Sequence, residues 1–264
     1  MKRPIGVSIW RWFIIAVVAA YLLIPIYAML DFSIKPFGGG NQSRTLRAWK
    51  VIPTQQDLGQ AIFVSLTMAV IVMLLVFVLV VPTVIWVHLK LPLLRRPLEL
   101  LCLLPLAIPA IVIVVGIAPI YRWIAINLTE SPITLSGVYL MLILPYTYRS
   151  LSASLDAVDI NTLAEAARTL GASTMRTIIG IIMPTIRTGI MNGAVISIAL
   201  VLGEFTISHL LNYKTLQVVI SQLGQTDGNV AVAVSVASLI FVFILLVLIP
   251  TTKRQNEVLD VDLA

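Results

Sequence analysis

Six long stretches of the chain contain no Asp, Glu, Lys or Arg, and they constrain its fold more than any other feature. They cover residues 12–30, 58–89, 100–121, 131–148, 188–203 and 228–252. A helix that crosses a bilayer needs about 20 predominantly apolar residues. The stretches therefore predict an all-α integral membrane protein with six transmembrane helices. The second is longer than one crossing requires, so its helix is expected at 61–87. The fifth is long enough only if the helix continues through 204–211, which places Glu204 inside a span.

The composition excludes several other classes of protein. Hydrophobic residues make up 59% of the 264 residues and charged residues only 11%, whereas a soluble domain carries about a quarter charged residues. This argues against a soluble enzyme, and the high hydrophobicity argues against a disordered chain. The net charge of +6 comes from residues in the gaps between the apolar stretches, not from a basic patch that could bind nucleic acid. The single cysteine, Cys102, excludes a disulfide framework.

Lys and Arg are distributed unevenly between the two sides of the predicted spans. With the N-terminus inside, twelve lie in inside segments and six in outside segments. Because cytoplasmic flanks carry the excess of these residues, we expect both termini in the cytoplasm. The chain then divides into a tail with the first span at 1–30, an external loop at 31–60, a five-helix core at 61–252 with a cytoplasmic loop at 149–187, and a tail at 253–264. No small-residue cleavage site follows the first span, so we expect a retained anchor and not a signal peptide.

The centre of the 149–187 loop reads 160-INTLAEAARTLGAS-173, which predicts a short helix with defined ends. Thr162 and Glu165 have the spacing of a capping box. Gly171 follows the last helical residues, where a left-handed residue commonly ends a helix. A second helix is expected from residue 173 toward Pro184, so that the segment forms a helix–glycine–helix elbow. On these signals alone, a solvated loop with local helical structure is the alternative.

The same segment resembles a known family motif. Glu165-Ala166-Ala167 is followed after three residues by Gly171, and after nine more by Ile181-x-Met183-Pro184. This resembles the EAA loop of ABC importer permeases, E-A-A-x3-G-x9-I-x-L-P, with Met183 in place of leucine as a departure of similar volume. The resemblance implies a type I ABC importer-like fold, in which the elbow between helices 4 and 5 carries a coupling helix that docks on a separate ATPase. The implied coupling residues are Thr162, Glu165, Ala166, Ala167, Gly171, Ile181 and Pro184.

The resemblance also implies partners and a location. These are a homologous permease subunit, expected to form a heterodimer with this chain, two copies of the ATPase, an extracellular or periplasmic solute-binding protein, and the lipid of a bacterial cytoplasmic (inner) membrane. The chain has no G-x-x-x-x-G-K-[ST] phosphate loop. ATP is therefore expected to bind to the partner, and the chain itself is expected to be no enzyme and to hold no cofactor, metal or nucleic acid.

The solute is suggested by a shorter region. Residues 203-GEFTISHLLNYKTLQVVI-220 look most like the second permease subunit of spermidine/putrescine importers, and Gly203-Glu204-Phe205 also looks like molybdate and sulfate permeases. The resemblance therefore implies a polyamine permease of the polyamine, iron, thiamine, molybdate and sulfate branch. A molybdate/sulfate-type oxyanion or iron importer is the alternative within the family. Outside the family, the alternatives are an ion-coupled secondary transporter and, less favoured because catalytic groups are missing, an intramembrane enzyme or a non-transporting scaffold.

Glu204 is the leading candidate for the translocation path. An ionisable group within a span costs about 2.5 kcal/mol or more and usually faces a cavity or a partner. A carboxylate there could replace water that an ammonium group loses on entry. The alternative is that Glu204 pairs with a basic group or lies at the outer end of its helix. Clustered prolines in 104–119 predict a kinked or broken helix along the path. The remaining path candidates are Pro105, Pro109, Asn192 and Ser197.

Overall fold

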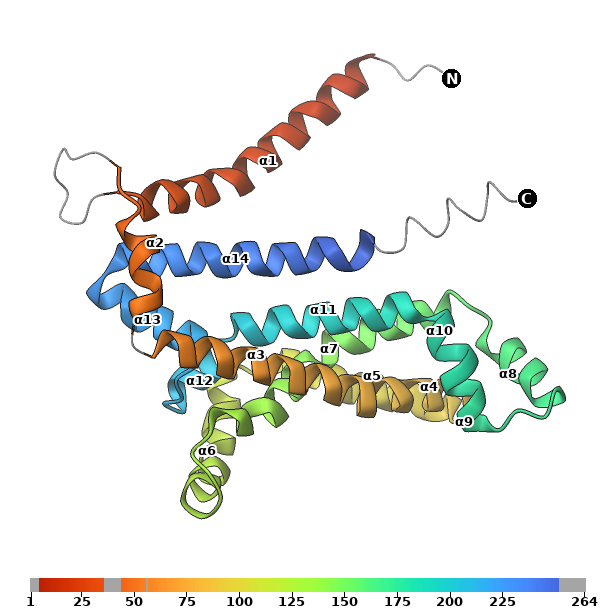
Figure 1. The fold of residues 1–264 in the computed structure, drawn as a ribbon. Coiled ribbons are helices and arrows are strands. Elements are labelled where there is room, and N and C mark those ends of the chain that lie inside the picture. Colours follow the sequence, from red (N-terminus) through yellow and green to blue (C-terminus); the bar gives the residue numbers. More distant parts are fainter. Residues whose placement is uncertain (1–4, 36–43, 56, 252–264) are drawn as a thin grey trace. The chain divides into compact units, whose positions relative to one another are not determined.

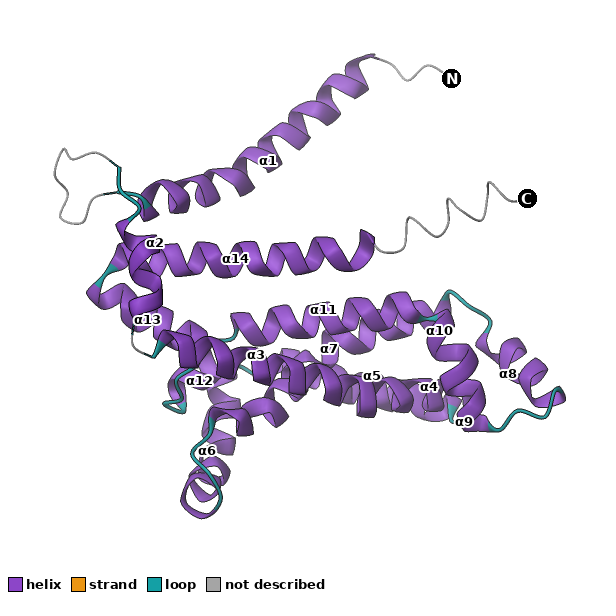
Figure 2. Ribbon diagram, viewed as in Figure 1, coloured by secondary structure: helices purple, strands orange, loops and turns teal. Residues whose placement is uncertain are grey.

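The structure is a computed structural model that describes residues 5–35, 44–55 and 57–251. Within these ranges the chain is helical and has no strand (Figure 2). The helices are α1 (Ile5–Ser33), α2 (Arg47–Val51), α3 (Leu58–Leu75), α4 (Val81–Lys90), α5 (Arg95–Ala107), α6 (Ala110–Asn127), α7 (Ser136–Asp156), α8 (Ile160–Thr169), α9 (Thr174–Thr177), α10 (Met183–Thr185), α11 (Arg187–Gly203), α12 (Thr206–Leu210), α13 (Leu216–Thr226) and α14 (Gly228–Thr251). Two π-helical segments, η2 (Val76–Val80) and η5 (Ile178–Ile182), and short 3-10 turns connect them.

The chain divides into two units. Unit 1 comprises the residues up to Gly59 and Val219–Phe243, and unit 2 comprises Gln60–Val218 and the chain from Ile244. The predicted tail at 253–264 and residues 36–43 of the predicted external loop lie outside the described residues.

In unit 1, polar contacts fasten the end of α1 to the start of α14 (Figure 1). The Asn229 amide donates to the carbonyl oxygens of Phe32, at 2.8 Å, and Lys35, at 3.2 Å. Arg47 on α2 forms an ion pair with Asp227 at 2.9 Å. These contacts anchor the end of α1 and the described part of the loop after it to the start of α14 and the residue before it.

In unit 2, α7 and α11 form the most extensive helix pair (Figure 1). Gly189 and Gly193 of α11 face α7, and the Ser150 hydroxyl donates to the Gly189 carbonyl oxygen at 3.0 Å. A β-carbon on Gly189 would lie 2.9 Å from the Ser150 carbonyl oxygen, and one on Gly193 would lie 3.2 Å from a methyl carbon of Thr147. Small residues four apart allow membrane helices to approach closely. The absence of side chains at these two positions is therefore what permits this packing.

The third predicted span, 100–121, is broken as its prolines predict. Helix α5 ends at Ala107, Ile108 is extended (φ −101°, ψ 120°), and α6 begins after Pro109. The helical region is sterically disfavoured for a residue that precedes proline, and the break falls at such a residue, Ile108.

Two other spans differ from the prediction at their ends. The second is helical from Leu58 to Lys90, three residues beyond 61–87 at each end, and contains the π segment η2. Helix α7 continues past the predicted 131–148 to Asp156, whose carboxylate forms an ion pair with Arg95 of α5. The predicted span ends before the first charged residue, Arg149, and so misses this extension, because a helix can continue beyond its apolar part.

The fifth span reaches Leu210, but it is not the continuous helix that we expected. Helix α11 ends at Gly203, Glu204 is extended (φ −77°, ψ 126°), and α12 begins at Thr206. The side chain of Glu204 accepts hydrogen bonds from backbone amides at the start of α12. A local acceptor therefore replaces the helical bonds that the break removes.

Within the described residues, four segments are long and apolar enough to cross a membrane: Trp10–Ser33, Leu58–Lys90, Ala110–Asn127 and Arg187–Leu210. A shorter apolar helix runs over Gly228–Ile244. The two predicted spans that are not among the four are 131–148 and 228–252: α7 is more polar than the other long helices, and the last span is represented by the shorter segment Gly228–Ile244.

The packing of α7 on α11 leads to a test with the variant Gly189→Ala. We expect a loss of about 1–3 kcal/mol of stability, because the added methyl group overlaps backbone that cannot move away cheaply. The matched control is Gly116→Ala on α6, where an added β-carbon has nothing within 4 Å. The midpoints of thermal unfolding in detergent measure the difference. Equal midpoints for the two variants would show that the close approach is not needed.

Candidate functional site

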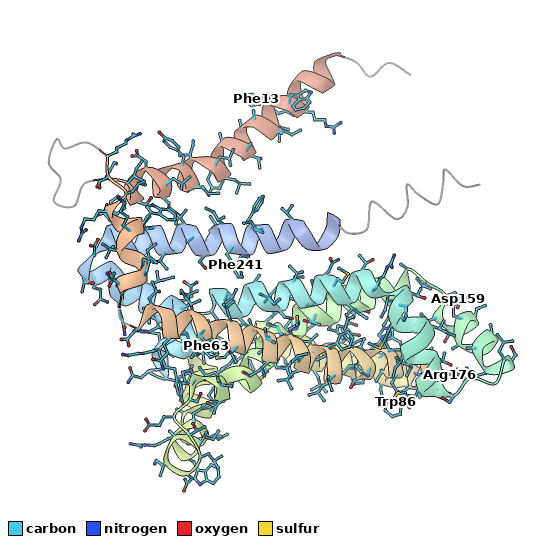
Figure 3. All side chains as sticks on the ribbon, viewed as in Figure 1. Phe13, Phe63, Trp86, Asp159, Arg176 and Phe241 are labelled. Atoms are coloured by element: carbon cyan, nitrogen blue, oxygen red, sulfur yellow. The ribbon has the colours of Figure 1, made fainter. Side chains whose placement is uncertain are left out.

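The short helix of the 149–187 loop is α8, and it is capped by Asp159 (Figure 3). An oxygen of its carboxylate accepts from the Thr162 amide at 3.2 Å, and the other accepts from the Thr162 hydroxyl at 2.6 Å. The predicted capping box of Thr162 with Glu165 is therefore wrong: Thr162 occupies the third helical position and bonds back to the cap. The available signal was Asp159 itself, because aspartate is a better N-cap than threonine.

The Asp159 carboxylate is held in its charged form. The hydroxyl of Thr162, and then its amide, donate to the carboxylate and lower the pKa of Asp159 below its ordinary value. Hydrogen bonds of this kind favour the ionised state. A negative charge at this position also complements the positive end of the helix.

The two faces of α8 have different roles in the packing. Ile160, Ala164 and Ala167 are buried, and α8 contacts α4, α9 and η5. Glu165 and Ala166 are exposed on the other side. The three residues of the Glu-Ala-Ala motif are thus divided: two face outward, and the third holds the helix against the rest of unit 2.

Gly171 ends α8 in the left-handed conformation that the sequence predicts, with φ +79°. The Ala172 amide donates to the Ala167 carbonyl at 3.0 Å, and the Gly171 amide donates to the Arg168 carbonyl at 2.9 Å. This is the Schellman arrangement of a helix C-terminus. It turns the chain sharply after Leu170, whose side chain is 88% exposed.

The second arm of the elbow is continuous from α9 through η5 to α10. Ser173 is the N-cap of α9, and its hydroxyl accepts a hydrogen bond from the Arg176 amide at 3.3 Å. Pro184 lies in the first turn of α10, and Ile181 is half-buried within η5. A proline ring clashes with the carbonyl four residues earlier in an ordinary helix. That residue is Gly180 of η5, where the wider π-helical turn accommodates the ring.

A second polar cluster lies at the break after α11. The Tyr139 hydroxyl, from α7, donates to one oxygen of the Glu204 carboxylate at 2.7 Å, and the Ile207 amide donates to the other at 2.8 Å. Ser208 approaches the carboxylate through its amide at 3.4 Å, and its hydroxyl is hydrogen-bonded to that of Tyr139. Tyr139 and Ser208 are buried and Glu204 is half-buried. The carboxylate therefore joins α7 to the start of α12.

The alternative in which Glu204 pairs with a basic group is not what the described residues show, since none of their ion pairs includes it. Its partners are a hydroxyl and backbone amides. The sequence does not indicate Tyr139 as a partner, because that residue lies 65 positions earlier in the chain.

The carboxylate lines a pocket of about 200 Å³. Pro105 from α5 and the rings of Tyr139 and Tyr146 from α7 line the same pocket. The structure thus brings together two of the predicted path residues, Glu204 and Pro105. The other candidates do not line this pocket: Pro109 is the N-cap of α6, Asn192 is exposed on α11, and the Ser197 hydroxyl donates to the Gly193 carbonyl at 2.7 Å.

The elbow and the polar cluster at Glu204 both lie within the part of the chain that matches a known family. Residues 85–252 match the family described as "Binding-protein-dependent transport system inner membrane component". The chain is 38% identical over 88 residues to the spermidine/putrescine transport system permease protein PotB of Salmonella typhimurium (strain SL1344), and these cover 33% of this chain and 30% of that protein. PotB of Escherichia coli (strain K12) is 36% identical over 88 residues, which cover 33% of this chain and 31% of that protein. The probable sulfate transport system permease protein cysT of Prototheca wickerhamii is 33% identical over 112 residues, which cover 39% and 44% of the two chains. The matches span less than half of these relatives.

The capping geometry of α8 predicts a pH dependence. Because the folded pKa of Asp159 is lowered, the stabilisation of α8 is present above the ordinary carboxyl pKa and is lost as the pH falls through the folded value. Asp159→Ala removes the cap and should increase amide hydrogen exchange across the first turn of α8 at neutral pH. Asp159→Asn keeps an acceptor and should protect the turn without this pH dependence. If Thr162→Ala exposes the first turn more than Asp159→Ala does, the assignment of the cap is wrong.

Proposed function

The chain belongs to the family of binding-protein-dependent transport system inner membrane components, and we propose that it is the permease subunit of an ATP-binding-cassette importer. In this proposal it forms half of a translocation path and pairs with a homologous permease in a bacterial inner membrane, with both termini and the elbow in the cytoplasm. Two copies of a separate ATPase hydrolyse ATP, and a solute-binding protein delivers the solute on the other side. All six predicted spans cross the membrane.

The observation that carries this proposal is the outward face of α8. Glu165 and Ala166 are exposed on a helix with a defined cap at each end, and Ala164 and Ala167 pack its other face against the protein. A helix held in this way can transmit a push from a docked ATPase, because its position relative to α4 and η5 is fixed by packing. A loop without these contacts would absorb the movement.

The movement has a direct route to the polar pocket. The arm that follows Gly171 leads into α11, which is 17 residues and therefore about 26 Å long. The far end of α11 is the break at Glu204, whose carboxylate bonds to α7. A shift of the elbow would therefore change the walls of the pocket through one helix.

The pocket supports a cationic solute of the polyamine class. Its carboxylate has hydrogen-bond donors but no basic side chain as an ion-pair partner among the described residues. Tyr146 is an aromatic residue that also lines the pocket and is partly exposed. An ammonium group is attracted both by a carboxylate and by the face of an aromatic ring. In this proposal Glu204 contacts an amino group of the passing solute.

A sulfate-type oxyanion is the second candidate, because the chain also resembles a probable sulfate permease over a larger share of that relative. The carboxylate argues against it, since like charges repel at short range in a partly dry pocket. Uptake of labelled spermidine against labelled sulfate by the reconstituted transporter distinguishes the two solutes.

The docking proposal is tested with Glu165→Arg. Reversing the charge in the centre of a protein interface costs several kcal/mol, so we expect the amount of ATPase that copurifies with the chain to fall about tenfold or more, together with ATP-driven uptake. The matched control is Glu130→Arg, which makes the same charge change at an exposed position after α6. If Glu165→Arg retains the ATPase and uptake as the control does, the coupling role is wrong. Uptake driven by an ion gradient without ATP would instead support a secondary transporter.

The path proposal is tested with Glu204→Gln and Tyr139→Phe. Loss of the negative charge should lower the rate of spermidine uptake about tenfold, whereas Tyr139→Phe keeps the charge and removes only one donor to it. Tyr139→Phe should therefore have the smaller effect on uptake. Unfolding midpoints of both variants separate a transport defect from a folding defect. Wild-type uptake with normal substrate dependence in Glu204→Gln would remove the carboxylate from the mechanism.

A further inference from the structure

An apolar groove lies in unit 2, beside the second arm of the elbow. Its volume is about 540 Å³. One wall is formed by Phe77, Val78 and Pro82, at the junction of η2 and α4, and the other by Ile179 and Met183 from the elbow arm and Met191 from α11. We call it the arm groove. A neighbouring hollow shares Pro82, Met175 and Ile178 with it and extends to Trp86 near the end of α4.

Both walls of the arm groove are built in the same unusual way. Each contains a π-helical segment, and each segment is followed at its second position by a proline, Pro82 after η2 and Pro184 after η5. Both prolines line the groove. A π-helical turn is rare and is found most often at functional sites. Because two such turns line the same groove, we interpret the groove as a functional site and not as a packing defect.

The chemistry of the lining selects the occupant. The lining residues are apolar except for Arg187, the first residue of α11, and no carboxylate is among them. Arg187 is exposed and forms no ion pair with a described residue. The N-terminus of α11 also lacks a side-chain cap. An apolar channel with one cation at its edge fits a molecule that has a long hydrocarbon part and one anionic group.

The aromatic and basic residues beside the groove also agree with such a molecule. Trp86 in the neighbouring hollow is half exposed and is followed by Lys90 at the end of α4. Figure 3 shows Trp86 close to the end of α4 that lies near Arg176 of α9. Tryptophan and basic residues are enriched where a membrane helix meets the lipid headgroups. We therefore expect the hollow at Trp86 to lie at the depth of the headgroups and the adjoining groove to lie deeper in the hydrocarbon.

We propose that the arm groove binds an anionic phospholipid of the leaflet on the elbow side, with one acyl chain between the two π segments and the phosphate paired with Arg187. Basic groups between membrane helices are a recognised means of binding such headgroups. This site is separate from the polar pocket at Glu204 and needs no particular solute. Because the elbow arm forms one wall, a bound lipid contacts the segment that joins α8 to α11.

The test uses phosphatidylglycerol and phosphatidylcholine that carry the same photoreactive group on one acyl chain. The purified chain, with any subunits that accompany it, is placed in nanodiscs containing a trace of either probe, and labelled peptides are mapped by mass spectrometry. We expect phosphatidylglycerol to label the groove about fivefold more than phosphatidylcholine, as one basic group near the surface is worth about 1 kcal/mol. The labelled peptides should contain Phe77–Pro82 and Met175–Met191.

Arg187→Gln should lower labelling by phosphatidylglycerol to the level of phosphatidylcholine, and leave the latter unchanged. The matched control is Arg122→Gln, an exposed arginine on α6 that does not line the groove. Val78→Trp fills the groove and should prevent labelling by both probes. Equal labelling of the wild-type protein by the two lipids would overturn the proposal. So would crosslinks from the groove to a second permease chain, since a protein would then occupy this surface.

Discussion

The close approach of α7 and α11 is the contact on which the rest of unit 2 depends. Gly189 and Gly193 remove the side chains that would separate the helices, and Ser150 bonds across the gap. At the other end of α11, Tyr139 of α7 bonds to Glu204. The same helix pair is therefore joined near both ends, and a movement of one helix must be followed by the other or must break these bonds.

Two interruptions of the helices expose backbone polar groups inside the apolar body of unit 2. The break between α5 and α6 falls at Ile108, which precedes a proline. The break between α11 and α12 falls at Glu204, whose carboxylate accepts a hydrogen bond from an amide that the break exposes. Backbone groups in a membrane must find partners within the protein, so an interruption requires an acceptor or a cavity beside it. The pocket between Pro105 and Glu204 has both features. The interruptions of the helices therefore account both for the polar groups of the pocket and for its position.

Local signals in the sequence predict much of the fold but not the partners of its polar side chains. The apolar stretches predict a membrane protein, the prolines predict the break near residue 109, and Gly171 predicts the left-handed end of α8. The cap of α8 is missed because Thr162 and Glu165 match the spacing of a capping box. The helix in fact begins three residues earlier, where Asp159 is the N-cap. The bond between Tyr139 and Glu204, like the contact of Gly189 with Ser150, joins positions far apart in the chain. Spacing along one segment carries no information about such contacts.

The one departure from the family motif has a structural explanation in the elbow arm. Met183 stands where the resemblance places leucine, and its side chain lines the arm groove together with Met175 and Met191. Methionine is unbranched and adapts to irregular apolar surfaces, whereas the branched leucine side chain has fewer shapes. The arm has to meet two surfaces at once: α8 lies against it on one side, and the groove opens on another. A methionine at 183 can adapt its side chain to the wall of the groove, while Ala164 and Ala167 on the buried face of α8 hold that helix in place.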